Sequence, residues 1–574
     1  MKVRNATLAL ACGFFLLVPG GWAADPPAPA QGDDAATQLQ RLKAQLEAQQ
    51  KQIEQLRTRL ETQEKLLEKT AASAGPAAPA GAAPAADPTH RPASLGEVAS
   101  TVPIIPPGIA AAAASPLPAP QQNALPTVAS PAPASPLQIH IGGATITPVG
   151  FMDLTNTWRS TNSGASLATN FASLPYDTTP QSHLSEDRFS AQNSRLGIRV
   201  DADFKGAHVL GYMEGDFVGF APTNSQVTSN SMTYRLRLYW VNVRKNIWEF
   251  QAGQSWSLLT PNRVGLSALP GDLFYGQEFD VNYLNGLTWG RIPGVRFIVH
   301  PNRVISAGIS LESAEQYIGG SGGAPTPVLP AAFAASNFFN EVDNGSTTTA
   351  VPNVHPDVIA KIAFDTKVAG KQWHFEVAGL ERTFKTYNPT TAQYFTKAGG
   401  GASVNMGLEV AKNFRLFTNN FWSDGGGRYL FGIVPDMIIR ANGSPSLIHT
   451  GSTLDGFEWQ MHNSMIYGYY GGIYAQRNTA LDANGSPIGY GFPGAPIAQN
   501  RTTQEITGGL TQTLWKDPRY GALQVFLQYA YFTRNPWMAP IAGPKMAMQH
   551  AAWFNFRYVL PGSAPTIEQP TGLK

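Results

Sequence analysis

Charged residues are scarce in this sequence. Lys, Arg, Asp and Glu make up 14% of the 574 residues, and the formal net charge is only +2. An ordinary soluble chain carries roughly 25% charged residues. The composition therefore argues against a cytosolic enzyme and against a nucleic-acid-binding protein with a basic surface. The mean hydropathy of −0.16 argues equally against a polytopic helical membrane protein.

Aromatic residues are absent from a long internal segment. Phe14, Phe15 and Trp22 are the only ones before residue 138, and all the others follow it. A segment without aromatic side chains lacks the large apolar groups that usually nucleate a core. The chain therefore divides into pieces of different character, and its average composition describes none of them.

Residues 1–23 have the pattern of a secretory signal peptide. A positively charged start precedes an apolar stretch, residues 6–18, that is too short to span a membrane. Small residues then suit cleavage after Ala23. A lipoprotein site at Cys12 is the weaker alternative, because the apolar stretch continues past it. Cleavage after Ala23 removes the chain's only cysteine, which excludes thiol catalysis and cysteine-based metal sites from the mature protein.

Residues 24–70 are predicted to form a short α-helical coiled coil in the periplasm. The heptad core positions run from residue 39 to residue 67, with no glycine or proline between them. The apolar stripe is narrow, which favours self-association over a single amphipathic helix. The core positions are Leu39, Leu42, Leu46, Gln49, Ile53, Leu56, Leu60, Gln63 and Leu67.

Residues 71–137 are predicted to be a disordered Ala/Pro-rich linker. This segment holds 15 prolines, and its only charged residues are Asp87, Arg91 and Glu97. Repeated Ala-Pro pairs favour extended polyproline II structure and prevent a long helix. We therefore interpret the segment as a spacer.

Polar and apolar side chains alternate along several stretches of residues 138–561, as they do in β-strands. Val358, Ala360 and Ile362, for example, share one face, and charged residues share the other. The stretches are residues 194–204, 234–239, 357–365, 404–410 and 552–558.

A soluble β-sandwich also alternates, with its apolar side chains inward. Here aromatic residues recur near the expected strand ends, the expected loops are long, and no convincing long amphipathic helix is present. These features favour an all-β fold, a transmembrane antiparallel β-barrel of about 16 strands, with its apolar face toward lipid. Strands of ~10 residues with their connections leave room for about 16 to 18. Residues 562–574 would follow the barrel as a tail.

Four stretches resemble porin strands: residues 194–197, 253–256, 427–430 and 504–515. The last stretch, and the order of coiled coil, spacer and barrel, resemble the DcaP-like trimeric outer-membrane porins in particular. The resemblance covers residues 146–561. It implies a homotrimer of 16-stranded barrels in the outer membrane, diffusive uptake of small anions such as dicarboxylates, and a periplasmic helical extension. The long spacer departs from that pattern.

Four arginines are candidates for a basic, solute-binding wall in the lumen: Arg195, Arg199, Arg235 and Arg237. Strict alternation places them on the polar faces of two strands, with Leu236 and Leu238 on the opposite face from Tyr239. A guanidinium group offers a planar fork that fits a carboxylate. The alternative is that they pair with luminal acids and stiffen the wall, and both roles can coexist. The acids are Asp201, Asp203, Glu214 and Asp216.

The segment from Pro261 to Gly286 shows no clean strand and carries the acids Asp272, Glu278 and Asp280. In general porins the equivalent loop folds into the lumen and narrows it. By this resemblance we expect a constriction loop here, with its acids facing the arginine wall. The alternative is an ordinary external loop.

Signals for an enzyme are poor. Residues 319–323 match G-x-S-x-G formally but lack its strand–turn–helix context. Residues 482–485 read as a turn rather than a calcium site. We expect no catalytic residue, metal or other cofactor. The sequence favours a porin for small hydrophilic solutes, with a preference for anions. The alternative is a structural envelope protein whose coiled coil tethers the outer membrane to peptidoglycan.

Overall fold

The computed structural model of the chain describes residues 136–562, with gaps at 164–166, 168, 221–231, 267–275, 277–282, 320–325, 337, 339–349, 352–353, 432 and 540–542. These residues belong to the second of the chain's two units, 1–118 and 119–574. The predicted signal peptide and coiled coil lie outside the described residues, as do most of the predicted linker and tail. In the part of the chain that is described, no helix is both long and apolar enough to cross a membrane.

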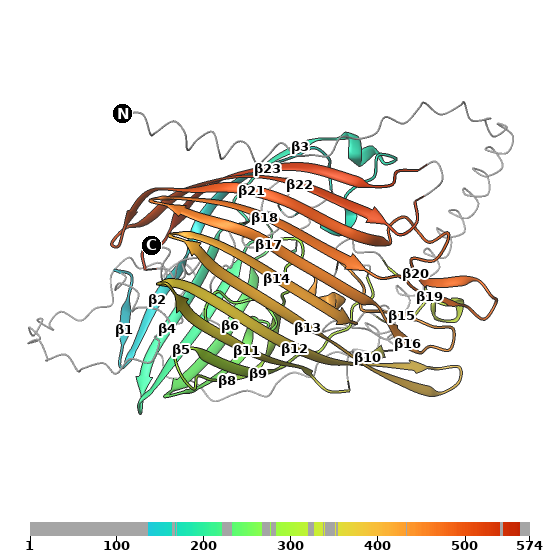
Figure 1. Cartoon of the computed structure of the whole chain (residues 1–574), viewed down its shortest axis with the longest axis horizontal. Coiled ribbons are helices and arrows are strands. Elements are labelled where there is room, and N and C mark those ends of the chain that lie inside the picture. The colour runs from blue at the N-terminus through green and yellow to red at the C-terminus, as the bar shows by residue number, and fades with distance from the viewer. Residues whose placement is uncertain are drawn as a thin grey trace, which may run out of the picture. The chain divides into compact units, whose positions relative to one another are not determined.

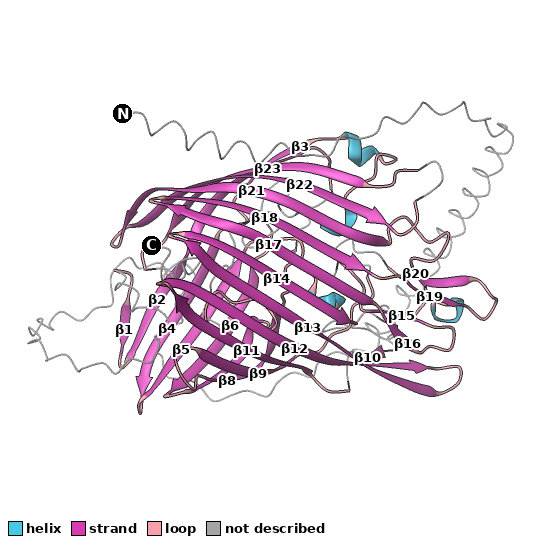
Figure 2. Cartoon of the chain, in the orientation of Figure 1, coloured by secondary structure: helices cyan, strands magenta, loops and turns pink. Residues whose placement is uncertain are grey.

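The described unit is built almost entirely of β-strands (Figure 2). The strands of the main sheet are β2 (Ala144–Arg159), β3 (Glu186–Ser190), β4 (Arg195–Phe204), β5 (Ala207–Asp216), β6 (Arg235–Lys245), β7 (Trp248–Trp256), β8 (Arg291–Val299), β9 (Ile305–Glu312), β11 (Asp357–Val368), β12 (Lys371–Asn388), β13 (Gln393–Ala411), β14 (Phe414–Asp424), β17 (His449–Met461), β18 (Ser464–Ala475), β21 (Asn500–Asp517), β22 (Gly521–Pro536) and β23 (Ala547–Val559). The shorter elements are β1 (Ile139–Ile141), β10 (Ala350–Val351), the hairpins β15 (Met437–Ile439)/β16 (Pro445–Leu447) and β19 (Asn478–Leu481)/β20 (Pro487–Tyr490), and the 3-10 turns η2 (Phe171–Ser173), η3 (Pro180–His183), η4 (Ala331–Phe333) and η5 (Gly427–Tyr429).

The main sheet closes into an antiparallel barrel of 16 strands (Figure 1). Each strand pairs with the next in the chain, and the ring closes where β2 pairs with β23. β3 and β4 are two parts of one strand, because both pair with the same edge of β2. A closed ring leaves no strand edge without a partner, as lipid requires. The predicted all-β barrel is confirmed.

The two ends of the barrel differ. At the end toward β1, which we call the turn end, most strands are joined by tight turns that use positive φ angles, for example at Asn246, Asn413 and His462. The opposite end, the loop end, carries the long connections and both small hairpins (Figure 1). Residues 482–485 form the turn of the β19/β20 hairpin, as the sequence predicted.

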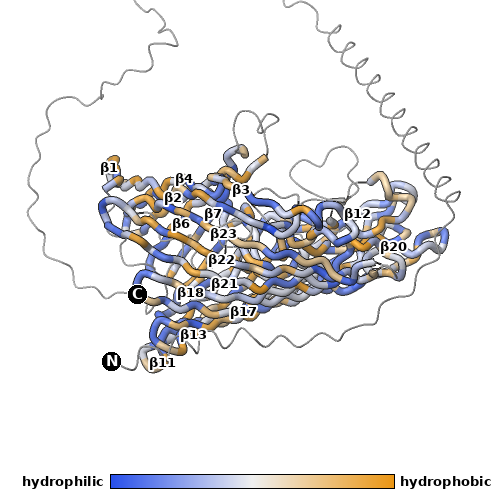
Figure 3. Tube along the Cα trace, turned by 90° about the horizontal axis from the view of Figure 1, so that it is seen from above, coloured by the Kyte–Doolittle hydropathy of each residue, from blue (hydrophilic) through white to orange (hydrophobic). Residues whose placement is uncertain are grey.

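The predicted alternation is confirmed along most strands, and Figure 3 shows hydrophilic and hydrophobic residues interleaved along them. On β11, Asp357 and Lys361 face inward and are buried, whereas Ile362 is 37% exposed on the outer face. On β23, Arg557 is buried inside and Phe556 is exposed outside. The outer face therefore presents apolar side chains where a bilayer would contact it.

The predicted alternation is wrong in β6. The register with β5 shifts between Glu214 and Gly215, which pair with Leu238 and Leu236, so Arg237 is an extra residue on β6. This β-bulge turns Arg237 and Leu238 both inward, and Tyr239 is 59% exposed outside. A bulge reverses the side-chain alternation beyond it, which a strict two-residue period cannot represent.

A second correction concerns residues 427–430, which the sequence likened to a porin strand. They form η5 and the residue after it, in the connection between β14 and β17. Tyr429 and Leu430 are fully buried in an apolar cluster inside the barrel. Loop residues such as Phe171, Leu258 and Trp289 join the same cluster. The sequence predicted that polar strand faces line the lumen, and the structure adds apolar loops that pack within it.

Candidate functional site

The four predicted arginines all face the lumen, on β4 and β6. They do not form an unpaired basic surface, because each lies against a carboxylate of β4 or β5. We call this surface, with Arg557 of β23, the arginine wall. The strands β23, β2, β4, β5 and β6 that carry it are consecutive neighbours in the ring.

Arg237 is the most tightly held member. It is fully buried, and it donates to Glu214 Oε1 and to Asp216 Oδ2, each at 2.8 Å. Arg195 is also buried and lies 3.6 Å from the same Glu214 oxygen. Arg235 donates two hydrogen bonds to Asp216, from Nε at 3.0 Å and from Nη2 at 2.7 Å. The two carboxylates thus pair with three guanidinium groups. These ion pairs join neighbouring strands and stiffen the wall.

Arg199 and Arg235 are the more accessible members. Each has a side chain 26% exposed. Arg199 forms two 2.8 Å hydrogen bonds with Asp201. Asp203 is 87% exposed near the turn end, where it meets His208 rather than an arginine. The carboxylate pairing weighed in the sequence analysis is therefore present for these arginines, with Asp203 as the exception.

Arg557 was not among the candidates, although the alternation of residues 552–558 already placed it on the polar face. It donates to Asp153 at 2.8 Å. Its guanidinium lies 4.1 Å from the ring centre of Phe151 and 4.5 Å from that of Phe526. Cation–π contacts and a buried carboxylate together fix this side chain.

Residues 257–290 connect β7 to β8, and their described parts fold into the barrel. Asn262 N donates to Glu376 at 3.1 Å, and Gly265 N donates to Asp365 at 2.9 Å. Arg263 forms a two-bond pair with Glu458 of β17, at 2.7 and 2.8 Å.

The returning half of this connection reaches farther round the ring. Asn285 N donates to Glu505 of β21 at 2.8 Å. Gly286 lies so close to the wall that an added Cβ would come within 2.2 Å of Thr453 O. The connection thus reaches from β7 and β8 to β17 and β21, as a constriction loop would. The predicted loop acids Asp272, Glu278 and Asp280 lie outside the described residues.

The strands that receive this loop form a second luminal surface, the loop-binding wall. Its carboxylates accept hydrogen bonds from loop backbone or loop arginine rather than from strand arginines alone. They are Glu312, Asp365, Glu376, Glu458 and Glu505. The alternation of residues 357–365 placed Asp365 on the polar face, but the sequence analysis did not single out the other four acids or any of the loop partners.

Lys361 shows how wall and loop interlock. Its Nζ lies 2.7 Å from Glu376 and donates to the backbone oxygen of Thr260 at 2.7 Å. Both charged side chains are fully buried. Burial of a charge is costly unless a partner compensates it, so this group depends on the loop staying in place.

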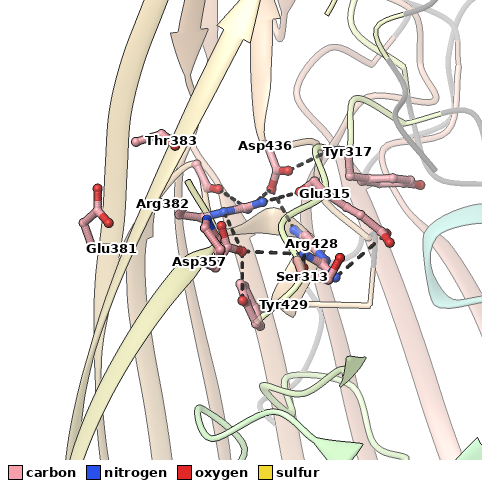
Figure 4. Close-up of polar contacts among 12 residues, drawn as sticks. Ser313, Glu315, Tyr317, Asp357, Glu381, Arg382, Thr383, Arg428, Tyr429 and Asp436 are labelled. Atoms are coloured by element: carbon pink, nitrogen blue, oxygen red, sulfur yellow. Dashed lines mark hydrogen bonds and ion pairs between the residues drawn. The ribbon is translucent and has the colours of Figure 1, made fainter. Parts of the chain in front are cut away.

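A second cluster fastens loops at the loop end (Figure 4). Arg382 of β12 lies between Asp357, at 3.4 Å, and Asp436, at 3.0 Å. It also donates to two loop carbonyls, those of Gly425 and Glu315.

Arg428 approaches Asp357 from η5, at 3.5 Å, and Tyr429 donates its hydroxyl to the same carboxylate at 2.9 Å. Burial raises the pKa of Asp436 above its ordinary value, although Arg382 and two backbone N–H groups act in the opposite direction. The cluster ties residues of two inward connections to the rim of the barrel.

No family model matches the chain, and no curated protein matches it significantly. Among solved structures, the chain is similar to the outer membrane channel DcaP of Acinetobacter baumannii. The TM-score is 0.52 and the sequence identity 15%, over 73% of this chain and 97% of that chain. An anion-selective porin from Comamonas acidovorans gives a TM-score of 0.41 and 12% identity, over 72% and 99% of the two chains. The likeness to DcaP shows the fold, and the predicted resemblance is confirmed at that level.

Proposed function

We propose that this chain is an outer-membrane porin that lets small hydrophilic solutes diffuse through the barrel. One observation carries the proposal: a closed ring of 16 strands is apolar outside, charged inside, and holds a long connection across its lumen. Such a ring is stable in lipid and offers water-soluble molecules a polar route. From the likeness of its fold to the DcaP channel, we also propose that the barrel assembles as a homotrimer.

The finer proposal is a preference for anions such as dicarboxylates. Among side chains buried in the strands, β2–β6 and β23 carry four arginines and three carboxylates. The partly exposed side chains of the same wall add two positive charges, Arg199 and Arg235, and one negative charge, Asp201. A charge in a narrow lumen acts through a focused field, so a small excess can decide the sign of the preferred ion. The arginine fork would exchange its wall carboxylate briefly for a solute carboxylate.

The constriction-loop acids Asp272, Glu278 and Asp280 belong to this proposal. In the sequence they lie between two described segments that contact the loop-binding wall. Negative side chains on the loop and guanidinium groups on the arginine wall would set a field across the opening. This transverse field would orient a solute whose charges are unevenly placed.

Single-channel recording in planar bilayers tests the proposal. We expect stepwise conductance from the folded full-length protein and a reversal potential of anionic sign in a KCl gradient. Succinate should reduce the chloride current, because it competes for the arginine forks. Absence of conductance from correctly folded protein would refute the porin and favour a structural envelope protein. Conductance with cation preference would refute only the anion preference.

A further inference from the structure

A depression of about 740 Å³ lies on the outer face of the barrel, across β13, β14, β17, β18 and β21. These strands run side by side across the front of Figure 1. The lining surface is mostly apolar, and the volume is within the range of ligand pockets. Because it opens outward, it is not part of the solute route.

Missing side chains create this groove. Gly451 of β17 and Gly472 of β18 face outward beside the rings of Trp422 and Tyr470. A Cβ added at Gly451 would contact the Trp422 ring at 3.5 Å, and one at Gly472 would meet the Tyr470 hydroxyl at 3.2 Å. Trp422 is 55% exposed, and Tyr474 is 43% exposed on the same face. The groove therefore has a glycine floor between aromatic sides.

Several polar groups of the floor are bonded within the wall. The single hydroxyl proton of Thr453 is within reach of two acceptors, Asp455 Oδ2 at 2.8 Å and Asn420 Oδ1 at 3.1 Å. Asn420 donates to Thr418 at 2.8 Å, and Gln504 donates to the Tyr470 hydroxyl at 3.1 Å. Satisfied polar groups carry a smaller penalty against hydrocarbon, so the floor can face an acyl chain.

A basic pocket of about 320 Å³ adjoins the groove at the loop end, and His449 lines both. Lys397 and Arg477 supply its positive charge. In the part of the barrel that the structure describes, neither pairs with a carboxylate, and Arg477 instead lies over the ring of Trp537. Asp424 is the one acidic side chain in its lining, and it lies 3.2 Å from His449.

The position of the two cavities suits a lipid that stands upright in the outer leaflet. Long loops mark the extracellular end of outer-membrane barrels, and aromatic side chains collect at head-group level. Trp422 and Tyr474 both pair with Gly451, two residues from His449, which lines both cavities. The cations of the basic pocket thus lie on the loop side of the head-group level, and the glycine floor extends from that level toward the turn end.

We propose that this outer surface binds a membrane lipid with a phosphate-bearing head group. The phosphate lies against Lys397 and Arg477, and an acyl chain fills the groove over Gly451. Such a lipid uses both features at once, because its acyl chain needs an apolar channel in the bilayer and its phosphate needs a cationic pocket at the end of that channel. A second protein copy has no such need for the two together. The inference rests on the outer-membrane location proposed above, but not on conduction.

Binding of lipid A to the delipidated full-length protein in detergent tests this inference. Lipid A that retains its phosphates should bind at one saturable site. Phosphatase-treated lipid A should bind at least about tenfold more weakly, and inorganic phosphate should not compete at equal concentration. Lys397→Gln and Arg477→Gln should each weaken binding roughly fivefold. Gly451→Leu should weaken the binding of both forms of lipid A, because its side chain fills the groove.

Arg501→Gln is the matched control. Arg501 is exposed and lies over the same Trp537 ring, 5.9 Å away, but it lines neither cavity, so binding should be unchanged. Equal affinity of all variants, or displacement by inorganic phosphate, would overturn the proposal. Loss of self-association in Gly451→Leu with lipid binding intact would assign the groove to a second copy. Conductance of each variant separates these outcomes from failure of the porin proposal.

Discussion

The two luminal walls of this barrel use carboxylates for different purposes. On the arginine wall, Glu214 and Asp216 bind guanidinium groups of neighbouring strands. On the loop-binding wall, Glu458 and Glu505 bind groups of the connection between β7 and β8. Among side chains buried in strands, β7–β21 carry seven carboxylates, four lysines and arginines, and His374. The excess of acid there is balanced by loop donors, so it fixes a loop rather than attracting solute.

The largest expected effect comes from breaking the loop-binding wall at Glu458. This carboxylate holds Arg263 and Arg415 and accepts the Tyr469 hydroxyl. Glu458→Gln leaves two buried guanidinium groups without their acid, and loss of one partner of a buried pair costs about 3–5 kcal/mol. We expect a fall of that size in the free energy of unfolding, measured by urea titration of the folded barrel.

Asp203→Asn is the control for Glu458→Gln, because Asp203 is 87% exposed on the arginine wall. Its unfolding free energy should change by less than about 0.5 kcal/mol. The Glu458 variant should also show a more variable conductance, since its loop is released. Equal stability of the two variants would mean that the loop-binding wall does not depend on this ion pair.

Substitutions in the arginine wall should change the ion selectivity of the pore rather than the free energy of unfolding. Arg199→Gln and Arg235→Gln each remove a partly exposed cation. A unit charge about 4 Å from a solute in water contributes ~1 kcal/mol, so each change should lower the anion-to-cation permeability ratio about fivefold. Reversal potentials in a KCl gradient measure this ratio. Lys205→Gln, at the turn end, is the matched control, and an equal shift there would exclude a specific role for the wall.

The smallest expected effect is a pH dependence that arises from the loop cluster. The pKa of Asp436 is raised by burial from its ordinary value of 3.8. The folded chain therefore keeps this proton at a pH where the unfolded chain has lost it. The resulting stabilisation is complete below pH 3.8 and is lost as pH rises through the raised pKa. Asp436→Asn should flatten this part of the stability curve in urea titrations at successive pH values. An unchanged slope would assign it to another group.

Alternation in the sequence predicted most of the barrel because the two faces meet different surroundings. Ile362 and Phe556 meet the outside, and Lys361 and Arg557 meet the lumen, so a period of two is imposed on each strand. The prediction was wrong where geometry departs from that period. The bulge at Arg237 depends on the register with β5, which no local pattern in β6 reveals.

The candidate site was predicted less completely than the fold. Alternation placed Arg195, Arg199, Arg235 and Arg237 inside, and possible carboxylate partners were named for them. The loop partners of Glu376 and Glu505 could not be predicted, because they lie more than a hundred residues away in the chain. Residues 427–430 were misread as a strand, since a short run of glycine, arginine and tyrosine suits a strand and a turn equally.

Outside the bulge in β6, the sequence by itself determined which side chains face outward and which face the lumen, because that choice follows from solvation of each residue along a strand. The scarcity of charge and the absence of aromatics from residues 23–137 belong to the same local information. Only the tertiary structure decided which charges neutralise one another and which hold the loop. Those outcomes depend on the closing of the ring, which brings Arg263 to Glu458 across 195 positions of the chain.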